Sequence, residues 1–285
     1  MKSKKAAVVF ITGQSNAHAH GQYLPEQERI TVPMKNVFAL DREQNQSFEL
    51  EDVVWSGFTT QGKNIGEWQD YTASLAYYLA VRWQDAIDAG GNLPDLYIVQ
   101  MSIGSQGIIN GMWNPDWPKA MEPGTLDVVN ISLYPFAKKI FPMVLDNLRC
   151  QGLEPEVIGW HWLGSEQEVC NGAYEREDFE SRYDSFFNGM LSFIGTDCPT
   201  YQYKLYFQKY CEANNIPPYA VDKINQQFER QCHHHRNMQI VRAEDCPNWD
   251  ENHPNWGIFC FDNGHYLAST QEWFADQFFQ KVYKT

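Results

Sequence analysis

Residues 10–21 read FITGQSNAHAHG, an apolar strand that runs directly into a turn containing a serine. Gly13, Ser15 and Asn16 are residue types that commonly end strands and form turns. The same place is chemically favoured, because open α/β sheets bind their ligands beyond the carboxyl ends of parallel strands. Ser15 is therefore either part of an ordinary turn or a candidate nucleophile, and the rest of the chain must decide.

Strand and helix patterns alternate along the chain, which predicts βαβ units and a mainly parallel central sheet. Most strand candidates are unbroken apolar runs, as expected of strands covered on both faces, whereas 202–208 alternates and is expected near a sheet edge. Thr72 is the expected cap of the first helix. The predicted strands cover residues 6–12, 36–40, 96–102, 156–163, 202–208 and 238–243, and helices are predicted between Thr72 and Gly90 and within 128–149, 179–190, 217–234 and 271–283.

Composition limits the classes of function. A chain of 285 residues that is 43% hydrophobic, without repeats or a Gly/Ser linker, is expected to form one domain over residues 1–285. The net charge of -14 argues against nucleic acid or an anionic membrane surface as a partner. No apolar run reaches the roughly 18 residues of a membrane span.

The N-terminal stretch and the cysteines bear on location. MKSKKAAVVFITG superficially resembles a secretory signal, but its apolar run is short and leads straight to Ser15, so we interpret it as the first strand. The seven cysteines show no C-x-x-C pair or zinc spacing and are expected to be mostly reduced. A cytoplasmic location is the expectation, and export of a longer precursor stays open.

Near the end of the chain, FDNGHYLA places Asp262 and His265 three residues apart. A carboxylate there can accept a hydrogen bond from one imidazole nitrogen and leave the other free to take a proton from a hydroxyl. This spacing predicts Ser15, His265 and Asp262 as nucleophile, general base and orienting acid. The alternatives are a capping serine and a surface histidine.

Two other groups of residues are weaker candidates. The loop 104–124 follows a predicted strand and contains Trp113 and Trp117, which could stack on a sugar ring or belong to the core. His18, His20 and the run 233–235 suggest a metal, but their spacing matches no metal motif, so we expect neither a metal nor another cofactor.

Four blocks, GQSN at 13–16, IGSQG at 103–107, GWHWLGSEQE at 159–168 and DNGH at 262–265, occur in the order found in SGNH hydrolases. The first block resembles the sialate O-acetylesterase and carbohydrate esterase family 6 branch. The resemblance implies a three-layer α/β/α fold related to flavodoxin, with Ser15 as nucleophile. The oxyanion would be stabilised by the backbone N–H groups of Ser15 and Gly104.

The third block departs from the family form, Trp-x-Gln-Gly-Glu. If Gly164 is the family glycine, Leu163 takes the amide position and cannot donate, and Gln167, Ser165 or the backbone must replace it in the oxyanion hole. In this block Glu166 competes with Asp262 for the support of the histidine.

The sequence thus predicts a serine esterase that removes an acyl group, acetyl in the first place, from a carbohydrate or similar polyol. Gln14 and Asn16 are expected to contact the substrate, although Asn16 could instead hydrogen-bond across the site or form a local turn. The alternatives are a catalytically silent carbohydrate-binding module and a lipase or thioesterase of the same superfamily.

Overall fold

The described residues of the chain form one seven-stranded sheet in the order β3-β2-β4-β1-β5-β6-β7, parallel except that β3 runs antiparallel to β2. The computed structural model describes residues 4–40, 57–62, 65, 71–116, 133–260 and 262–283. The strands are β1 (Lys4–Gly13), β2 (Val37–Leu40), β3 (Phe58–Thr59), β4 (Asp95–Ser102), β5 (Leu153–Leu163), β6 (Thr200–Tyr203) and β7 (Met238–Val241).

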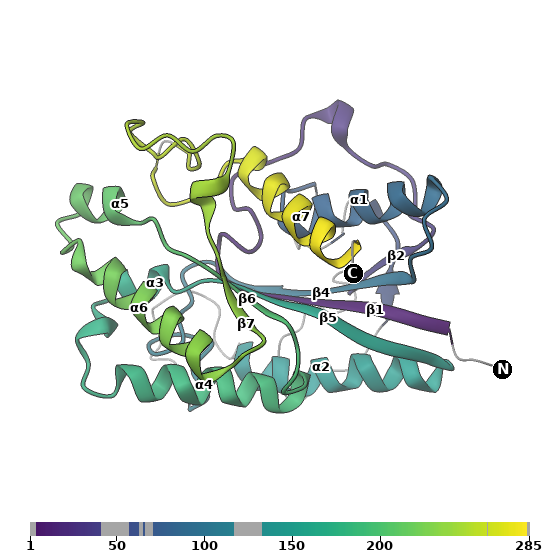
Figure 1. The fold of residues 1–285 in the computed structure, drawn as a ribbon, viewed down its shortest axis with the longest axis horizontal. Helices are drawn as coiled ribbons and strands as arrows, with labels where there is room; N and C mark the ends of the chain where they lie inside the picture. The colour runs from purple at the N-terminus through teal and green to yellow at the C-terminus, as the bar shows by residue number, and fades with distance from the viewer. Residues whose placement is uncertain are drawn as a thin grey trace, which may run out of the picture.

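Helices cover both faces of this sheet and make the three layers that were expected (Figure 1). On one face lie α1 (Leu75–Asp88) and α7 (Ala268–Tyr283), and on the other lie α2 (Leu133–Cys150), α4 (Phe179–Ile194) and α6 (Tyr219–His234). The shorter helices are α3 (Glu166–Cys170) and α5 (Gln208–Ala213), with 3-10 turns at Glu26–Glu28, Ala173–Glu175 and Ala243–Asp245. In the flavodoxin order the second strand lies beside the first, whereas here β4 lies between β1 and β2.

The side chains of the central strand β1 explain why helices cover both faces of the sheet. These side chains alternate between two cores, with Val8 and Phe10 in the core under α2 and α4 and Val9 and Ile11 in the core under α1 and α7. All four are 0% exposed. Burying such a side chain contributes about 1.5–3 kcal/mol, so a strand that is apolar on both faces is stable only between two layers of helices.

Two sequence-based expectations are wrong in detail. The strand expected over 202–208 covers only Thr200–Tyr203, although it lies near the sheet edge as expected, between β5 and the edge strand β7. Its polar Gln202 is itself buried, so the alternation does not mark an exposed face. Helix α1 is capped by Ser74, whose side chain accepts from the Tyr77 N–H, because Thr72 is still extended and bridged to Tyr23.

Helix α2 spans Leu133–Cys150 with Pro142 inside it, and so overlaps the helix predicted within 128–149. In the described part of the chain, no helix has the length and apolar character needed to cross a membrane.

The carboxyl ends of the three central strands meet at one place. Gly13 pairs with Ser102 of β4 on one side and with Leu163 of β5 on the other. The chain crosses from one side of β1 to the other between β4 and β5, so this is the switch point where α/β sheets bind ligands. Gly13 has φ +137°, and a Cβ there would lie 1.9 Å from the Leu163 carbonyl oxygen.

We expect Gly13→Ala to destabilise the protein more than Gly195→Ala. Both glycines have similar φ values, +137° and +131°, but the space around Gly195 is open. Gly195→Ala should lose about 1–3 kcal/mol through backbone strain alone, and Gly13→Ala should lose about 1–3 kcal/mol more through overpacking. Urea denaturation measures both, and equal losses would contradict the close approach of β1 and β5.

Candidate functional site

Ser15 lies two residues beyond β1, in a turn that extends to Gly21, and its side chain is half-buried. Gly104 follows β4 and lies close to Ser15, since a Cβ placed on Gly104 would lie 3.8 Å from the Cβ of Ser15. Within the described residues, the backbone N–H groups of Ser15 and Gly104 have no hydrogen-bond partner. Two unused backbone donors thus lie close to the Ser15 side chain.

His265 and Asp262 form a directly bonded pair in the loop before α7. The Asp262 Oδ2 lies 2.6 Å from His265 Nδ1, and Oδ1 accepts from the backbone N–H groups of Gly264 and His265 at 2.9 and 3.0 Å. Burial alone would raise the pKa of Asp262, but these hydrogen bonds outweigh it and lower the pKa below its usual value. An ionised carboxylate only accepts, so His265 Nδ1 carries the proton and Nε2 is left unprotonated in the neutral ring.

Asn16 brings the serine and the histidine together. Its Nδ2 donates to the Gly264 carbonyl at 2.9 Å, and its Oδ1 accepts from the Tyr266 N–H at 3.0 Å. These two residues flank His265, and Asn16 directly follows Ser15. No hydrogen bond joins the Ser15 hydroxyl to His265 among the described residues, and such bonds are often long before substrate binds.

The alternative in which Asn16 bonds across the site is thus confirmed, and its expected contact with substrate is wrong. Asn16 is 2% exposed, and both ends of its amide are occupied by protein groups. Gln14 is also buried, and its Oε1 accepts from the backbone N–H of Gln167 at 3.3 Å. That bond holds the start of α3 next to the serine turn.

Glu166 contacts Asn16 rather than the histidine. Its Oε1 accepts from Asn16 Nδ2 at 2.6 Å, while its Oε2 has no hydrogen-bond partner among the described residues. Burial raises the pKa of Glu166, and the hydrogen bond from Asn16 and the nearby His265 oppose that rise. Asp262 is therefore the carboxylate in direct contact with His265. Glu166 instead contacts Asn16, which in turn bonds the two neighbours of His265.

The loop after Gly104 is anchored by a second buried carboxylate, which the sequence reasoning missed. The Glu168 Oε1 accepts from the backbone N–H groups of Ile108 and Ile109 at 2.6 and 3.1 Å. Burial raises the pKa of Glu168 to about 7, although those two bonds oppose it. Gly107 is required beside it, because a Cβ at that position would lie 2.1 Å from Oε1.

Trp113 belongs to the core, so its expected role in stacking on substrate is wrong. Its indole is 0% exposed, packs edge-on against Trp162 with ring centroids 5.5 Å apart, and donates through Nε1 to the Gly13 carbonyl at 2.8 Å. This hydrogen bond holds the buried indole against the carboxyl end of β1. Trp117, the other expected stacking residue, lies outside the described residues.

The histidines of the serine turn lie next to the candidate base. The His20 and His265 ring centroids are 5.2 Å apart, and those of His18 and His20 are 5.9 Å apart. Among the described residues, no group of three or more His, Cys, Asp or Glu side chains is arranged to hold a metal ion.

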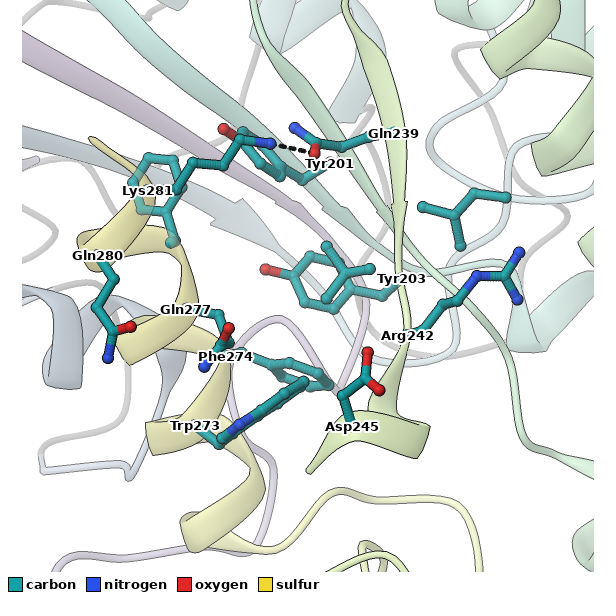
Figure 2. A pocket seen from close by; sticks show the side chains of 13 residues that line it. Tyr201, Tyr203, Gln239, Arg242, Asp245, Trp273, Phe274, Gln277, Gln280 and Lys281 are labelled. Atoms are coloured by element: carbon teal, nitrogen blue, oxygen red, sulfur yellow. Dashed lines mark hydrogen bonds between the residues drawn. The ribbon is translucent and has the colours of Figure 1, made fainter. Parts of the chain in front are cut away.

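A separate groove of about 400 Å³ lies between α7 and the strands β6 and β7. Figure 2 shows Tyr203 and Phe274 lying against one another in it, with Arg242 and Asp245 at one side. None of the candidate residues named above lines this groove. The combination of hydroxyl, imidazole and carboxylate is at the carboxyl ends of β1 and β4 instead.

Comparisons with known proteins agree on the fold. No family model and no curated protein matches the sequence. The structure is similar to that of NanS, with a TM-score of 0.60 and 14% identity over 100% of both chains. It is also similar to a protein from Arabidopsis thaliana, with a TM-score of 0.54 and 13% identity over 98% of this chain and 97% of that one.

A carbohydrate acetylesterase from Xanthomonas citri matches with a TM-score of 0.48 and 13% identity, over 96% of this chain and 54% of that one. The expected α/β/α fold is confirmed by the sheet with its two helical layers and by the likenesses to NanS and the Arabidopsis protein.

We expect Glu168→Gln to change how stability depends on pH. The folded pKa of Glu168 is about 7 against an ordinary 4.5, so the unfolded chain releases this proton first, and wild-type stability falls as pH rises from about 4.5 to about 7. The variant should lack this loss, on the order of 3 kcal/mol. Urea denaturation at pH 4.5 and 8, beside the exposed control Glu177→Gln, measures it; parallel pH profiles for wild type and Glu168→Gln would contradict the assignment.

Proposed function

We propose that the protein is a serine esterase that hydrolyses acyl esters, acetyl in the first place, on a carbohydrate or similar polyol. The observation that carries the proposal is the Asn16 side chain, which bonds both neighbours of His265 and so holds the imidazole beside the turn that contains Ser15. A hydroxyl, an imidazole and an ionised carboxylate in this order form the arrangement that activates a serine.

The proposed reaction runs through an acyl-enzyme. The neutral His265 takes the Ser15 proton on Nε2 while the serine oxygen attacks the ester carbonyl, and Asp262 stabilises the resulting imidazolium through Nδ1. The free N–H groups of Ser15 and Gly104 stabilise the oxyanion, each contributing on the order of 3 kcal/mol to lowering the barrier. His265 then gives the proton to the leaving alcohol and activates the water that releases the acid.

The backbone supports a different alignment of the divergent third block with the family form. Ser165, with φ +91°, adopts the left-handed conformation that favours glycine, and Gly164 does not. We infer that Ser165 stands at the family glycine, which puts Gly164, rather than Leu163, at the amide position. That position then has no side chain, and Gln167, tied by its backbone to Gln14, is the proposed third donor.

The carbohydrate as substrate rests on the four sequence blocks, of which the first resembles the sialate O-acetylesterase and carbohydrate esterase family 6 branch. The second candidate function is a carbohydrate-binding protein without catalysis, and the observation that favours it is the missing amide at Gly164. The two candidates differ in whether Ser15 reacts.

We expect Ser15→Ala and His265→Ala each to lower kcat on an acetyl ester by a factor of about a thousand or more, because triad members act as a unit. The assay is acetate release from acetylated xylan fragments, acetylated sialic acids and an aryl acetate. Ser192→Ala, an exposed serine on α4, serves as the control that keeps wild-type rates. Wild-type turnover by Ser15→Ala would rule the mechanism out.

Covalent labelling separates the esterase from the silent binder. An activated serine attacks the phosphorus of a fluorophosphonate probe and displaces fluoride, so wild type should be labelled at Ser15 and His265→Ala should not, because the base that activates the hydroxyl is gone. Mass spectrometry of the labelled peptide identifies the residue. An unlabelled wild type that still binds xylan fragments would favour the binding protein.

A further inference from the structure

His20 is held at the rim of the candidate site by its backbone. Its N–H donates to the Ser15 carbonyl at 3.0 Å, and the residues on either side both have left-handed backbones, Ala19 with φ +53° and Gly21 with φ +74°. An alanine rarely adopts this conformation, and such outliers concentrate at functional sites. The turn thus fixes where the exposed His20 side chain stands relative to Ser15.

The His20 ring lies beside the ring of the candidate base. Its centroid is 5.2 Å from that of His265, with the planes at 48°. On its other side the buried His18 packs edge-on, and His18 Nδ1 is 3.3 Å from the Ser102 hydroxyl at the end of β4. Ser102 and His18 thus support His20 from within the protein.

His20 is exposed, and within the described residues its ring nitrogens have no hydrogen-bond partner. His265 does not depend on His20 for its orientation, because Asp262 bonds its Nδ1 and Asn16 bonds its two neighbours in the chain. The imidazole of His20 is therefore a donor and acceptor that faces solvent beside a base already held by other groups.

In the proposed reaction, His265 gives its proton to the leaving oxygen, so the alcohol part of the ester must lie against the side chains that surround His265. In a carbohydrate ester that alcohol is the sugar. We infer that His20 is a specificity-determining residue that hydrogen-bonds a sugar hydroxyl next to the ester, an inference that rests on the proposed function. A neutral hydroxyl suits an imidazole because both can donate and accept.

The test compares two acetyl esters, an acetylated xylose oligomer and an aryl acetate whose leaving group has no neighbouring hydroxyl. His20→Phe keeps a ring beside His265 but cannot hydrogen-bond, and His20→Ala removes both properties. In each variant the ratio of kcat/KM on the sugar ester to kcat/KM on the aryl ester should fall about tenfold, the usual effect of one lost hydrogen bond. His233→Ala, an exposed histidine near the end of α6, is the matched control and should leave the ratio unchanged.

An unchanged ratio in His20→Phe overturns the inference, whether or not the overall rates fall. If His20→Ala alone loses activity on both esters, the ring merely packs against His265, and the inference is also overturned. Ser15→Ala is measured in the same assay: if it equals wild type on the aryl ester, the proposed function itself fails, which is distinct from an unchanged ratio. Near-UV circular dichroism of each variant confirms that the fold is intact.

Discussion

The hydrogen bonds of Asn16 join parts of the chain that are about 250 residues apart, and the geometry of the candidate site depends on them. The side chain bonds Glu166, Gly264 and Tyr266, and its backbone carbonyl accepts from Gln271 Nε2 at 2.7 Å. Gln271 in turn accepts from the first N–H of α1. One buried amide therefore couples the serine turn to the histidine loop, to α3 and to both helices of one layer.

Such a network stabilises only when it is complete. Net, each hydrogen bond contributes on the order of 1 kcal/mol, but a buried polar group left without a partner costs about 1–3 kcal/mol. Asn16 is 2% exposed, so water cannot replace a lost partner. The loop that carries His265 is thereby held in position by the same residue that follows the candidate nucleophile, and the two ends of the chain form one site.

Three carboxylates near this site differ in charge because their surroundings differ. Asp262 is partly exposed and receives three hydrogen bonds, which keep it ionised. Glu166 and Glu168 are buried, and desolvation raises the pKa of both. Only Asp262 is suited to stabilise a charged imidazole, while Glu168 suits the anchoring of the loop after β4. The sequence alone could not separate these roles, because all three residues are simply acids in candidate blocks.

The difference between what was predicted and what was not follows from the range of the interactions involved. The strands around Val9, Ile98 and Trp160 were predictable because an unbroken apolar run can be stable only between two covering layers. The Asp262–His265 contact was predictable because three residues of turn fix it locally. The burial of Trp113 was not predictable, since the sequence pattern is the same whether an aromatic residue in a loop faces solvent or packs in the core next to Gly13.

The sequence by itself therefore determined the α/β class, the alternation of strands and helices along the chain and the local pair of acid and imidazole, because these depend on periodicity and on neighbours in the chain. Tertiary structure alone decided that Asn16 faces Gly264, that Ser165 rather than Gly164 takes the left-handed turn, and that His20 stands beside His265. Each of these depends on which strand lies next to β1, and no pattern of residues along the chain encodes that contact directly.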